Sequence, residues 1–497
     1  MFKKTVLGLF CAALGVAGTL IGATPASAKQ FDGVTVNLMT FTGPVISSPL
    51  QARAPDFDKL TGAHVNIITV PFADLYTKIL TDFATGTNSI DAIVFPPQWM
   101  VDFANPGYLL PLDKFIAKDK KIDWNGITPF IRDFSTRYAG KIYSVPLDGD
   151  MLTIYYRKDL LKRDGLKPPE TWDQYVSIAK HFQGKDLNGD GKPDYGSCVT
   201  MKRNAQAYWM IYAIASPYLQ YKGTRQGVFF NLKNMDPLVK NPGMRRAMEI
   251  YKDLVKYGPP GQLNFDISDS RNMFLSGRCA LILDWGDTGT LVIDPKQSHV
   301  IGKVGVAMTP GSTQVYDRST RKMEKCTPKL CPYAVDGVNH APYAAFGGWS
   351  GAVNAASKPR VQEAAYAFLS YMSQPAQSNV DVTIGTTGMN PYRTVQYKDL
   401  DKWVKAGMTK AFAKSYLGAI KKSFESPNVV LDLRIPYNQR YQEVVLDSVV
   451  AQMAAGQLSI DQAMNQLYKG WQQITKQIGR KSQLAAYKKS LEITSTQ

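Results

Sequence analysis

GKIYSVPLDGDMLTIYYRKDLLKRDG, residues 140–165, is the stretch that decides the predicted fold. It starts as a strand between turns, passes the acidic segment 148–150, and continues as a second apolar strand over 151–156. A charged helical run ends it. Two strands in one line, with carboxylates where they meet, indicate a backbone that passes from one sheet to another. We therefore predict a crossover between two lobes, with a ligand bound where the chain crosses.

Strand and helix patterns alternate in the sequence before this crossover. Apolar runs rich in β-branched residues take turns with segments of helical spacing, in the order 33–39, 50–60, 64–70, 74–84 and 91–95. This order predicts an α/β fold in which a parallel sheet carries helices on both faces. In open sheets of this type, ligands bind beyond the carboxyl ends of the strands. Those ends carry residues 40–42 and 96–99.

The crossover resembles the first interlobe crossover of the extracellular solute-binding proteins of ABC importers, family 1, the carbohydrate-binding class that includes maltose-binding protein. The matching positions are Gly140, Lys141, Tyr143, Val145, Pro146, Tyr156, Lys158, Asp159, Leu160 and Leu161. Further blocks follow in the order of the family, at 107–112, 168–175, 274–285, 347–353 and 456–471. The resemblance covers most of the chain after residue 28.

The resemblance implies a two-lobed periplasmic-binding-protein fold of type II, in which parallel-rich sheets flanked by helices are joined by several crossovers. It implies lobe 1 over 29–147, lobe 2 over 148–308, a return to lobe 1 over 309–386, and a return to lobe 2 with the C-terminal helices over 387–497. The strand expected at 304–309 would carry the chain back to lobe 1. Residues 311–345 have no counterpart in the family, and they form a lid, a partner-facing loop or a passive surface insertion.

The amino terminus predicts export. Lys3 and Lys4 precede an apolar run over residues 6–21, and residues 26–28 offer the small-x-small pattern of a secretory signal. We therefore expect a signal peptide over 1–28, cleavage after Ala28, and a soluble, monomeric protein in the periplasm.

The chain is basic, with 58 Lys and Arg against 41 Asp and Glu and a formal net charge of +17. Such a balance favours anionic surroundings in general. The cations are scattered along the sequence, however, and no nucleic-acid-binding motif is present. We expect no nucleic-acid partner.

Four cysteines remain after the predicted cleavage, and an oxidising compartment favours their pairing. Cys326 and Cys331 close a short loop that contains a proline, which predicts a disulfide. A metal site needs more ligands than this pair supplies. Cys198 and Cys279 lie in apolar strand-like runs. They pair if those strands are neighbours, and otherwise they remain small core residues.

Sugar recognition requires hydrogen-bonding carboxylates, amides and hydroxyls together with aromatic faces that cover C–H patches. The predicted lobe edges supply both kinds of side chain. The candidate ligand-binding residues are Thr40, Thr42, Gln98, Trp99, Asp148, Asp150, Tyr208, Trp209, Asp284, Trp285, Asp287, Trp349, Asn390 and Arg393. The resemblance implies sugar contact for Asp150, which stands at the place of a crossover carboxylate, and aromatic contact for Trp285. The alternative is structural: a tryptophan at a strand end also serves as a core residue.

Acidic residues gathered at the predicted cleft disfavour an anionic ligand, because carboxylates and anions repel one another. Lys202, Arg203 and Arg393 would reduce that repulsion. A neutral sugar or polyol is therefore the expected ligand, delivered to the membrane permease subunits of an ABC importer.

Residues 186–194, DLNGDGKPD, match the start of a calcium-binding loop. The side chains of Asp186, Asn188, Asp190 and Asp194, with the carbonyl of Lys192, would hold a structural calcium ion. The closing glutamate of such loops is replaced by a serine, so a polar turn without metal is the alternative. No cofactor is expected to be required.

The sequence argues against catalysis. It has four His, and none lies near a nucleophile in a recognised motif. No G-x-S-x-G, H-E-x-x-H or Gly-rich phosphate loop is present. Paired aspartates alone would suit a secreted glycosidase, and a lectin-like adhesin is the other alternative. The favoured function is the substrate-binding component of an ABC importer, which is not an enzyme.

Overall fold

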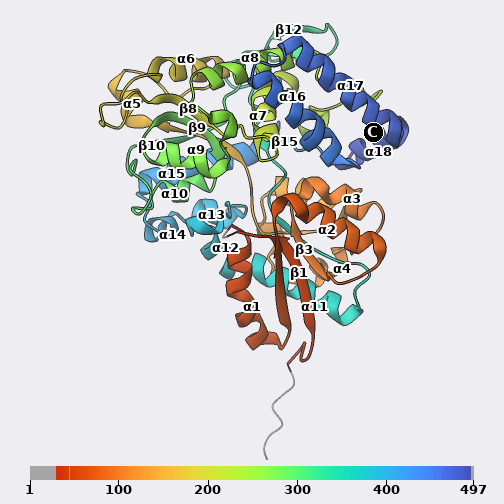
Figure 1. Cartoon of the computed structure of the whole chain (residues 1–497). Helices are drawn as coiled ribbons and strands as arrows, with labels where there is room; N and C mark the ends of the chain where they lie inside the picture. Colours follow the sequence, from red (N-terminus) through yellow and green to blue (C-terminus); the bar gives the residue numbers. More distant parts are fainter. Residues whose placement is uncertain (1–28, 44, 494–497) are drawn as a thin grey trace, which may run out of the picture.

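Two lobes, each built on its own β-sheet, make up the computed structural model, which describes residues 29–43 and 45–493 (Figure 1). The predicted two-lobed α/β fold is thereby confirmed. The predicted signal peptide, residues 1–28, lies outside the described residues. In the described part of the chain, no helix combines the length and the apolar character that crossing a bilayer requires.

The sheet of the first lobe has the strand order β2-β1-β3-β14-β6. Its strands are β1 (Thr35–Phe41), β2 (His64–Val70), β3 (Ala92–Phe95), β6 (Val145–Pro146) and β14 (Ser350–Val353). β1 pairs in parallel with β2 and β3, whereas β14 runs antiparallel to β3 and β6. Every residue of β3 and β14 is buried, which means that both faces of the sheet are covered.

Helices cover this sheet. They are α1 (Ser47–Thr61), α2 (Phe72–Thr85), α3 (Met100–Ala104), α4 (Asp113–Lys118), α11 (Pro359–Ser373) and α12 (Pro375–Asp381). The two helices expected at 50–60 and 74–84 are confirmed as α1 and α2. Each ends at a glycine in the left-handed region, Gly62 with φ 80° and Gly86 with φ 67°, where a side chain would be strained.

The sheet of the second lobe has the strand order β10-β7-β9-β8. Its strands are β7 (Leu152–Arg157), β8 (Tyr195–Val199), β9 (Cys279–Trp285) and β10 (Val304–Met308). Only β8 and β9 pair in parallel among these four strands, so the expectation of parallel-rich sheets is wrong for this lobe. The reason is that β7 enters the middle of the sheet straight from the crossover, and both of its neighbours run against it.

The second lobe also carries most of the helices. They are α5 (Lys158–Arg163), α6 (Trp172–Phe182), α7 (Ala207–Leu219), α8 (Pro242–Lys256), α9 (Ile267–Leu275), α10 (Thr288–Leu291), α15 (Lys410–Glu425), α16 (Asp447–Ala454), α17 (Ile460–Ile478) and α18 (Arg480–Ser490). Thr171 caps α6, since its side chain accepts the backbone N–H of Gln174 at 3.2 Å. α7 is buried along its whole length and forms the centre of this lobe.

Short elements connect these parts. Two small strand pairs are β4 (Arg137–Tyr138) with β5 (Lys141–Ile142) and β13 (Tyr343–Ala344) with β15 (Val430–Leu431). Helices α13 (Thr394–Lys398) and α14 (Leu400–Lys405) precede α15. The 3₁₀ turns are η1 (Pro97–Trp99), η2 (Trp124–Gly126), η4 (Thr224–Gln226), η5 (Gln262–Asn264) and η6 (Gly385–Thr387), and the π-helical turns are η3 (Ile131–Ser135) and η7 (Arg440–Leu446).

Three crossover segments lie side by side between the lobes: 147–151, 346–349 and 388–392. The backbone N–H of Leu147 donates to the carbonyl of Trp349 at 3.0 Å, and that of Gly149 donates to the carbonyl of Asn390 at 3.3 Å. Gly149 has no room for a side chain, because a Cβ there would lie 2.5 Å from the Pro391 carbonyl oxygen. Such short, closely packed crossovers suit a hinge.

The insertion, residues 311–345, packs on the second lobe. Its hairpin of β11 (Gln314–Asp317) and β12 (Lys322–Lys325) contacts α7 and α8, and the Asn339 amide donates to the Pro217 and Gln220 carbonyls at 2.7 and 2.9 Å. The expectation that the chain returns to lobe 1 before the insertion is therefore wrong. β10 stays in the second sheet, and the return is made by 346–349. The other expected lobe boundaries stay predictions.

Both cysteine pairs form disulfides. Cys326 and Cys331 pair as predicted, with Cα atoms 5.5 Å apart. Cys198 and Cys279, whose pairing the sequence left open, also pair, because β8 and β9 are neighbouring strands and bring the two Cα atoms to 5.9 Å. The second bond joins two fully buried residues in the core of the second lobe.

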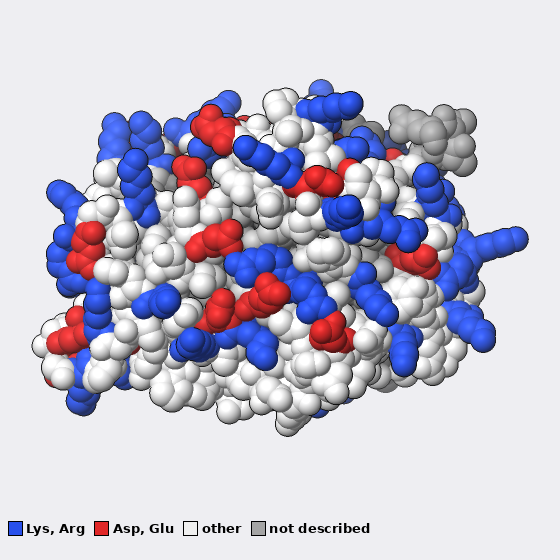
Figure 2. Space-filling view, turned by 90° about the horizontal axis from the view of Figure 1, so that it is seen from above, with Lys and Arg blue, Asp and Glu red and all other residues white. Residues whose placement is uncertain are grey.

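Basic side chains are spread over the face of the second lobe seen in Figure 2, and acidic side chains interrupt them. Several arginines in the described chain are paired with carboxylates, as Arg246 is with Asp173 at 2.7 Å. The positive charge is thus distributed over this face and does not form one continuous stripe.

Candidate functional site: the cleft between the lobes

A cavity of about 400 Å³ lies between the two lobes. The first lobe and the crossovers line one part of it with Phe41, Val45, Phe72, Ala73, Pro96, Asp150, Phe346, Trp349 and Gly388. The second lobe lines the rest with Asn204, Ala205, Gln206, Trp209, Asp266, Ile267, Ser268, Arg271, Trp285 and Asp287. Because both lobes contribute, a molecule held here would contact both at once.

Aromatic rings form a continuous surface from one lobe to the other. Phe41, at the end of β1, stacks on Trp349 with ring centroids 4.6 Å apart. Trp349 contacts Phe346 edge-on at 5.7 Å, and Phe346 lies 5.0 Å from Trp209 at the start of α7. Trp285, at the end of β9, meets Trp209 edge-on at 5.7 Å. Such rings suit the C–H faces of a sugar or polyol.

Arg271 of α9 is held between two carboxylates on the second-lobe side of the cavity. Its guanidinium donates to both oxygens of Asp284 at 3.0 Å, and to both oxygens of Asp287 at 2.6 and 2.8 Å. Burial lowers the pKa of Arg271, but the attraction of the two carboxylates outweighs it and the pKa is raised overall. These two bidentate pairs, called forks below, fix the guanidinium in one orientation at the cavity wall.

The first crossover places two aspartates beside Asn390 of the third. The Asn390 amide nitrogen donates to Asp148 at 3.0 Å and to Asp150 at 2.8 Å. Burial raises the pKa of both carboxyls, and the charge of Asp148 adds to the increase at Asp150, which lies well above its ordinary value. The protonated form of Asp150 is thereby favoured, and a protonated carboxyl can both donate and accept.

Besides the amide oxygen of Gln206, two polar atoms at this site have no hydrogen-bond partner among the described residues. They are the indole nitrogen of Trp285 and the amide oxygen of Asn390. Both residues are buried, at 3% and 0% exposure. One is a donor and the other an acceptor, which is the pair of functions that a hydroxyl group satisfies.

The candidate residues divide into three groups. Those that line the cavity are Asp150, Trp209, Trp285, Asp287 and Trp349. Those that lie behind its wall are Gln98, Asp148, Tyr208, Asp284 and Asn390, which hydrogen-bond to or pack against lining residues or the crossovers. Those placed elsewhere are Thr40, Thr42, Trp99 and Arg393.

The four residues placed elsewhere correct the sequence-based prediction. The Thr40 hydroxyl donates to the Val94 carbonyl inside the first sheet, and Thr42 is exposed outside the cavity. Trp99 is a core residue, as its structural alternative allowed, and packs edge-on against a tyrosine of α2. Arg393 turns away from the cleft, because its guanidinium is held by the Ser373 and Ile122 carbonyls of the first lobe.

Several lining residues were missed by sequence reasoning. Arg271 looks like any surface arginine of an amphipathic helix, since its partners come later in the chain. Phe41 and Phe72 flank strand and helix ends that the sequence did predict, so the rule that ligands lie beyond strand ends could have found Phe41. Phe346 adopts φ 46° just before Gly347 and Gly348, and no residue pattern signals that conformation.

The predicted calcium loop is a network of turns. The Asp186 carboxylate accepts the N–H groups of Gly189 and Gly191 at 2.7 and 2.9 Å. Asp194 is fully buried and pairs with Arg278 at 2.9 Å. Within the described residues, no three acidic, cysteine or histidine side chains gather as a metal site would need. The prediction of calcium therefore gains no support.

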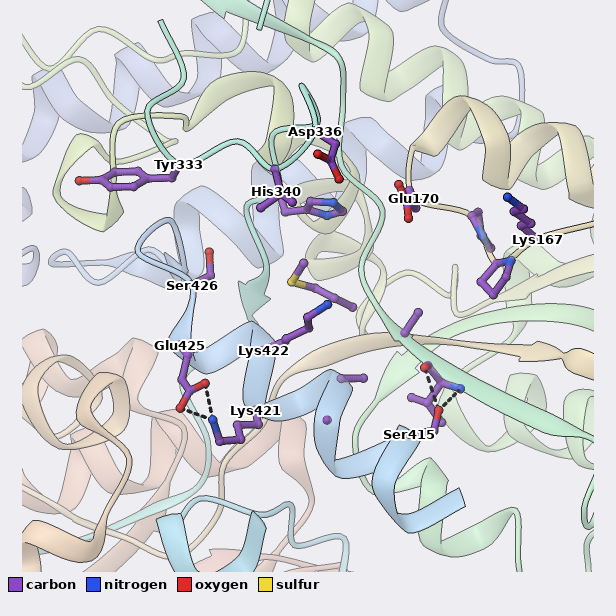
Figure 3. A pocket seen from close by; sticks show the side chains of 18 of the residues that line it. Lys167, Glu170, Tyr333, Asp336, His340, Ser415, Lys421, Lys422, Glu425 and Ser426 are labelled. Atoms are coloured by element: carbon purple, nitrogen blue, oxygen red, sulfur yellow. Dashed lines mark hydrogen bonds and ion pairs between the residues drawn. The ribbon is translucent and has the colours of Figure 1, made fainter. Parts of the chain in front are cut away.

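A larger hollow, of about 950 Å³, lies on the second lobe alone (Figure 3). It is bounded by α15, β10, the loop 167–170 and the insertion. Lys422 extends into it below His340, while Lys421 pairs with Glu425 at 2.5 Å. Since the first lobe contributes nothing to its lining, closure of the lobes would not enclose a ligand there.

Two lobes that enclose an aromatic-lined cavity between them and are joined by three closely packed crossovers define the class of ligand-trapping binding proteins. A family model described as bacterial extracellular solute-binding protein matches residues 43–379. The chain belongs to this family, and the resemblance seen in the sequence is confirmed.

Two curated relatives are binding proteins named for a polyol. The chain is 28% identical over 240 residues to a mannitol-binding protein of Pseudomonas aeruginosa, a match that covers 48% of this chain and 51% of that protein. It is 22% identical over 274 residues to an erythritol/L-threitol-binding protein of Mycolicibacterium smegmatis, covering 52% and 54%. The chain thus spans about half the length of these curated relatives.

Solved structures share the whole fold. An ABC transporter solute-binding protein from Agrobacterium radiobacter K84, in complex with ribitol, matches with a TM-score of 0.71 and 23% identity over 90% of this chain and 100% of that one. A solute-binding protein from Agrobacterium vitis S4 with bound D-mannitol matches with a TM-score of 0.66 and 24% identity, over 90% and 99%. At these identities the likeness shows the fold alone.

Proposed function

We propose that this protein is the substrate-binding component of an ABC import system, which captures a neutral sugar or polyol between its lobes and delivers it to the membrane permease. The observation that carries the proposal is a cavity walled by both lobes that combines aromatic faces with hydrogen-bonding carboxyls. Closure is driven by contacts that the ligand makes only in the closed form.

The ligand contacts follow from the site. Phe41, Trp349 and Trp285 would cover C–H faces of the ligand, while Asp150 and Asp287 would bind its hydroxyls. The fixed guanidinium beside Asp287 leaves the cavity without excess positive charge, because the two carboxylates that pair with it outnumber it. A neutral ligand avoids both the repulsion of an anionic ligand by Asp284 and Asp287 and the desolvation of an unpaired charge.

The size of the ligand and the setting of the protein belong to the same proposal. The cavity of about 400 Å³ lies at the small end of ligand pockets, which favours a small polyol or monosaccharide over a long oligosaccharide. The mannitol- and ribitol-binding relatives support a polyol. Export through a signal peptide cleaved after Ala28, residence in the periplasm, a monomeric state and docking on permease subunits complete the proposal.

A thermal-shift screen of mono- and disaccharides and linear polyols tests it. A ligand at 100 times its Kd adds about 2.7 kcal/mol to the stability of the bound form, which the melting temperature reports. Mannitol or ribitol should raise the melting temperature, and calorimetry should then give one site per chain without product. A glycosidase would release product from a glycoside instead, and a lectin would bind without closing. No response to any polyol or sugar would contradict the proposal.

A further inference from the structure

The lobes also touch at a second contact, which begins beside the 346–349 crossover, where Asp432 accepts the backbone N–H of Phe346 at 2.9 Å, and in which η1 and α3 of the first lobe face residues 432–447 of the second. Asp102 of α3 accepts the backbone N–H of Tyr437 at 2.8 Å and the hydroxyl of Tyr76 at 2.9 Å. Gln98 of η1 hydrogen-bonds both aromatic residues at the start of α7, at 3.3 Å each. In Figure 1, α3 lies at the top of the first lobe, below α16 and α18.

Glu443 lies in this contact, in the middle of the π-helical turn η7. Such turns shift side chains out of the α-helical register and occur frequently at functional sites. One Glu443 oxygen accepts the Gln439 amide at 3.2 Å. The other oxygen faces the indole nitrogen of Trp99 in the first lobe, but neither of these two atoms forms a hydrogen bond of normal geometry with any described residue.

None of the described groups with the largest effect on Glu443 is a cation. The charges of Asp447 and Asp432 in the second lobe raise the pKa of Glu443. The charge of Glu443 in turn raises the pKa of Tyr76 in α2 and of Tyr208 in α7. The positive charge of Arg203 acts to lower the pKa of Asp447, a neighbour of Glu443. Burial raises the pKa of Glu443 to about 7, against the opposing effect of Trp99, and the charge of Asp447 adds to the increase.

We propose that Glu443 couples closure of the lobes to uptake of a proton, so that the protein closes more readily as the pH falls through neutrality. The inference rests on the proposed function only in requiring that the lobes open and close. In an open form, water reaches Glu443 and the carboxylate ionises as usual. When η1 and α2 of the first lobe close over it, an ionised carboxylate without a cation loses that water at a cost, which a protonated one avoids.

Linkage gives the direction and the size of the effect. The closed form binds the proton more tightly than the open form does. The extra stability of the closed form is therefore present at low pH and is lost as the pH rises through the pKa that Glu443 has in the closed form. Glu443 has a pKa of about 7 in the closed form, and we take its ordinary pKa of 4.5 for the open form. With these two values, the closing equilibrium is about tenfold more favourable at pH 6 than at pH 8. Asp102 adds to this from the other lobe, because burial raises its pKa to about 6.

The test measures lobe separation without any ligand. Dyes on cysteines introduced at the exposed positions Lys78 of α2 and Lys252 of α8 report the closed fraction by energy transfer, from pH 6 to pH 8. The closing equilibrium of the otherwise unchanged protein should rise about tenfold as the pH falls. Glu443→Gln, which imitates the protonated form, should lose most of this change and close at pH 8 as readily as the parent does at pH 6.

A matched control and a second variant keep the test decisive. Glu425→Gln removes a glutamate that pairs with Lys421 on the surface of α15, and it should keep the parent profile. If Glu443→Gln fails to fold, Asp447→Asn removes a neighbouring negative charge and should shift the midpoint of the profile to lower pH. A pH-independent parent, or an Asp447→Asn midpoint that does not move, would overturn the proposal, as would a Glu443→Gln profile identical to the parent. Since no ligand is present, a failed polyol screen leaves this result unaffected.

Discussion

The carboxylate of Asp148 in the first crossover accepts two hydrogen bonds from Asn390 in the third, one from its backbone N–H at 2.5 Å and one from its side-chain amide at 3.0 Å. The second oxygen of Asp148 accepts the backbone N–H of Trp349, in the remaining crossover, at 3.3 Å. One buried carboxylate therefore joins three segments that are far apart in the sequence. This arrangement ties the three crossovers together, as a hinge between two lobes requires.

Removing this carboxylate should destabilise the protein. We expect Asp148→Ala to lower the free energy of unfolding by about 2–4 kcal/mol, because it leaves buried N–H groups without an acceptor. Urea denaturation measures the change. Asp56→Ala on the surface of α1 is the control and should stay within about 0.5 kcal/mol of the parent. Equal effects of the two substitutions would show that Asp148 does not hold the crossovers.

Arg271 should act through the geometry of its side chain as well as its charge. Arg271→Lys keeps the charge but cannot form the two forks to Asp284 and Asp287, so those carboxylates lose their fixed positions at the cavity. We expect ligand affinity to fall at least tenfold, about 1.4 kcal/mol, in calorimetry with the polyol that stabilises the parent. Arg245→Lys, in an exposed pair with Asp461, should bind as the parent does. If Arg271→Lys binds the ligand with unchanged affinity, the two bidentate pairs of Arg271 do not contribute to ligand binding.

Trp285 should contribute to ligand binding through its ring face and its unpaired indole nitrogen. Trp285→Ala should weaken binding at least tenfold, by about 1.4 kcal/mol or more, while circular dichroism shows the fold retained. Trp124→Ala, at a half-buried position in η2 outside the cavity lining, is the matched control and should leave affinity unchanged. If both variants bind equally well, Trp285 is only a core residue.

The two disulfides should differ in their contribution to stability. The bond between Cys198 and Cys279 closes a loop with a sequence separation of 81, and that between Cys326 and Cys331 one of 5. The loss of chain entropy in the unfolded state predicts about 4 kcal/mol for the first and about 2 kcal/mol for the second. Thermal unfolding of the paired serine variants measures both. A larger loss from the short loop would contradict this ordering.

Much of the fold could be predicted because the signals are local. The alternation of apolar residues gives β2 over His64–Val70, exactly the residues expected, and the turn residues around the first crossover mark where the chain changes lobe. Trp285 and Asp150 reach the cavity because a strand end and a crossover fix their positions. In each case the neighbouring residues determine where the backbone goes.

The remainder depends on contacts between distant segments. Arg393 also stands at a predicted crossing, but carbonyls of the first lobe hold its side chain away from the cleft. Arg271 reaches the cavity only because β9 brings two carboxylates beside α9. The insertion has no family counterpart, and only its hydrogen bonds to the end of α7 place it on the second lobe. The periodicity of apolar residues predicts where strands and helices lie, but it does not predict the direction that a side chain takes when distant segments hold it.

The central claim is that the two halves shut over a small polyhydroxylated molecule, and small-angle X-ray scattering with and without that molecule tests it most directly. Addition of the polyol that gives the largest thermal shift, at a concentration that calorimetry shows to be saturating, should reduce the radius of gyration of the protein. An unchanged scattering curve at full occupancy would contradict the account, because the ligand would then be bound without any closure of the lobes.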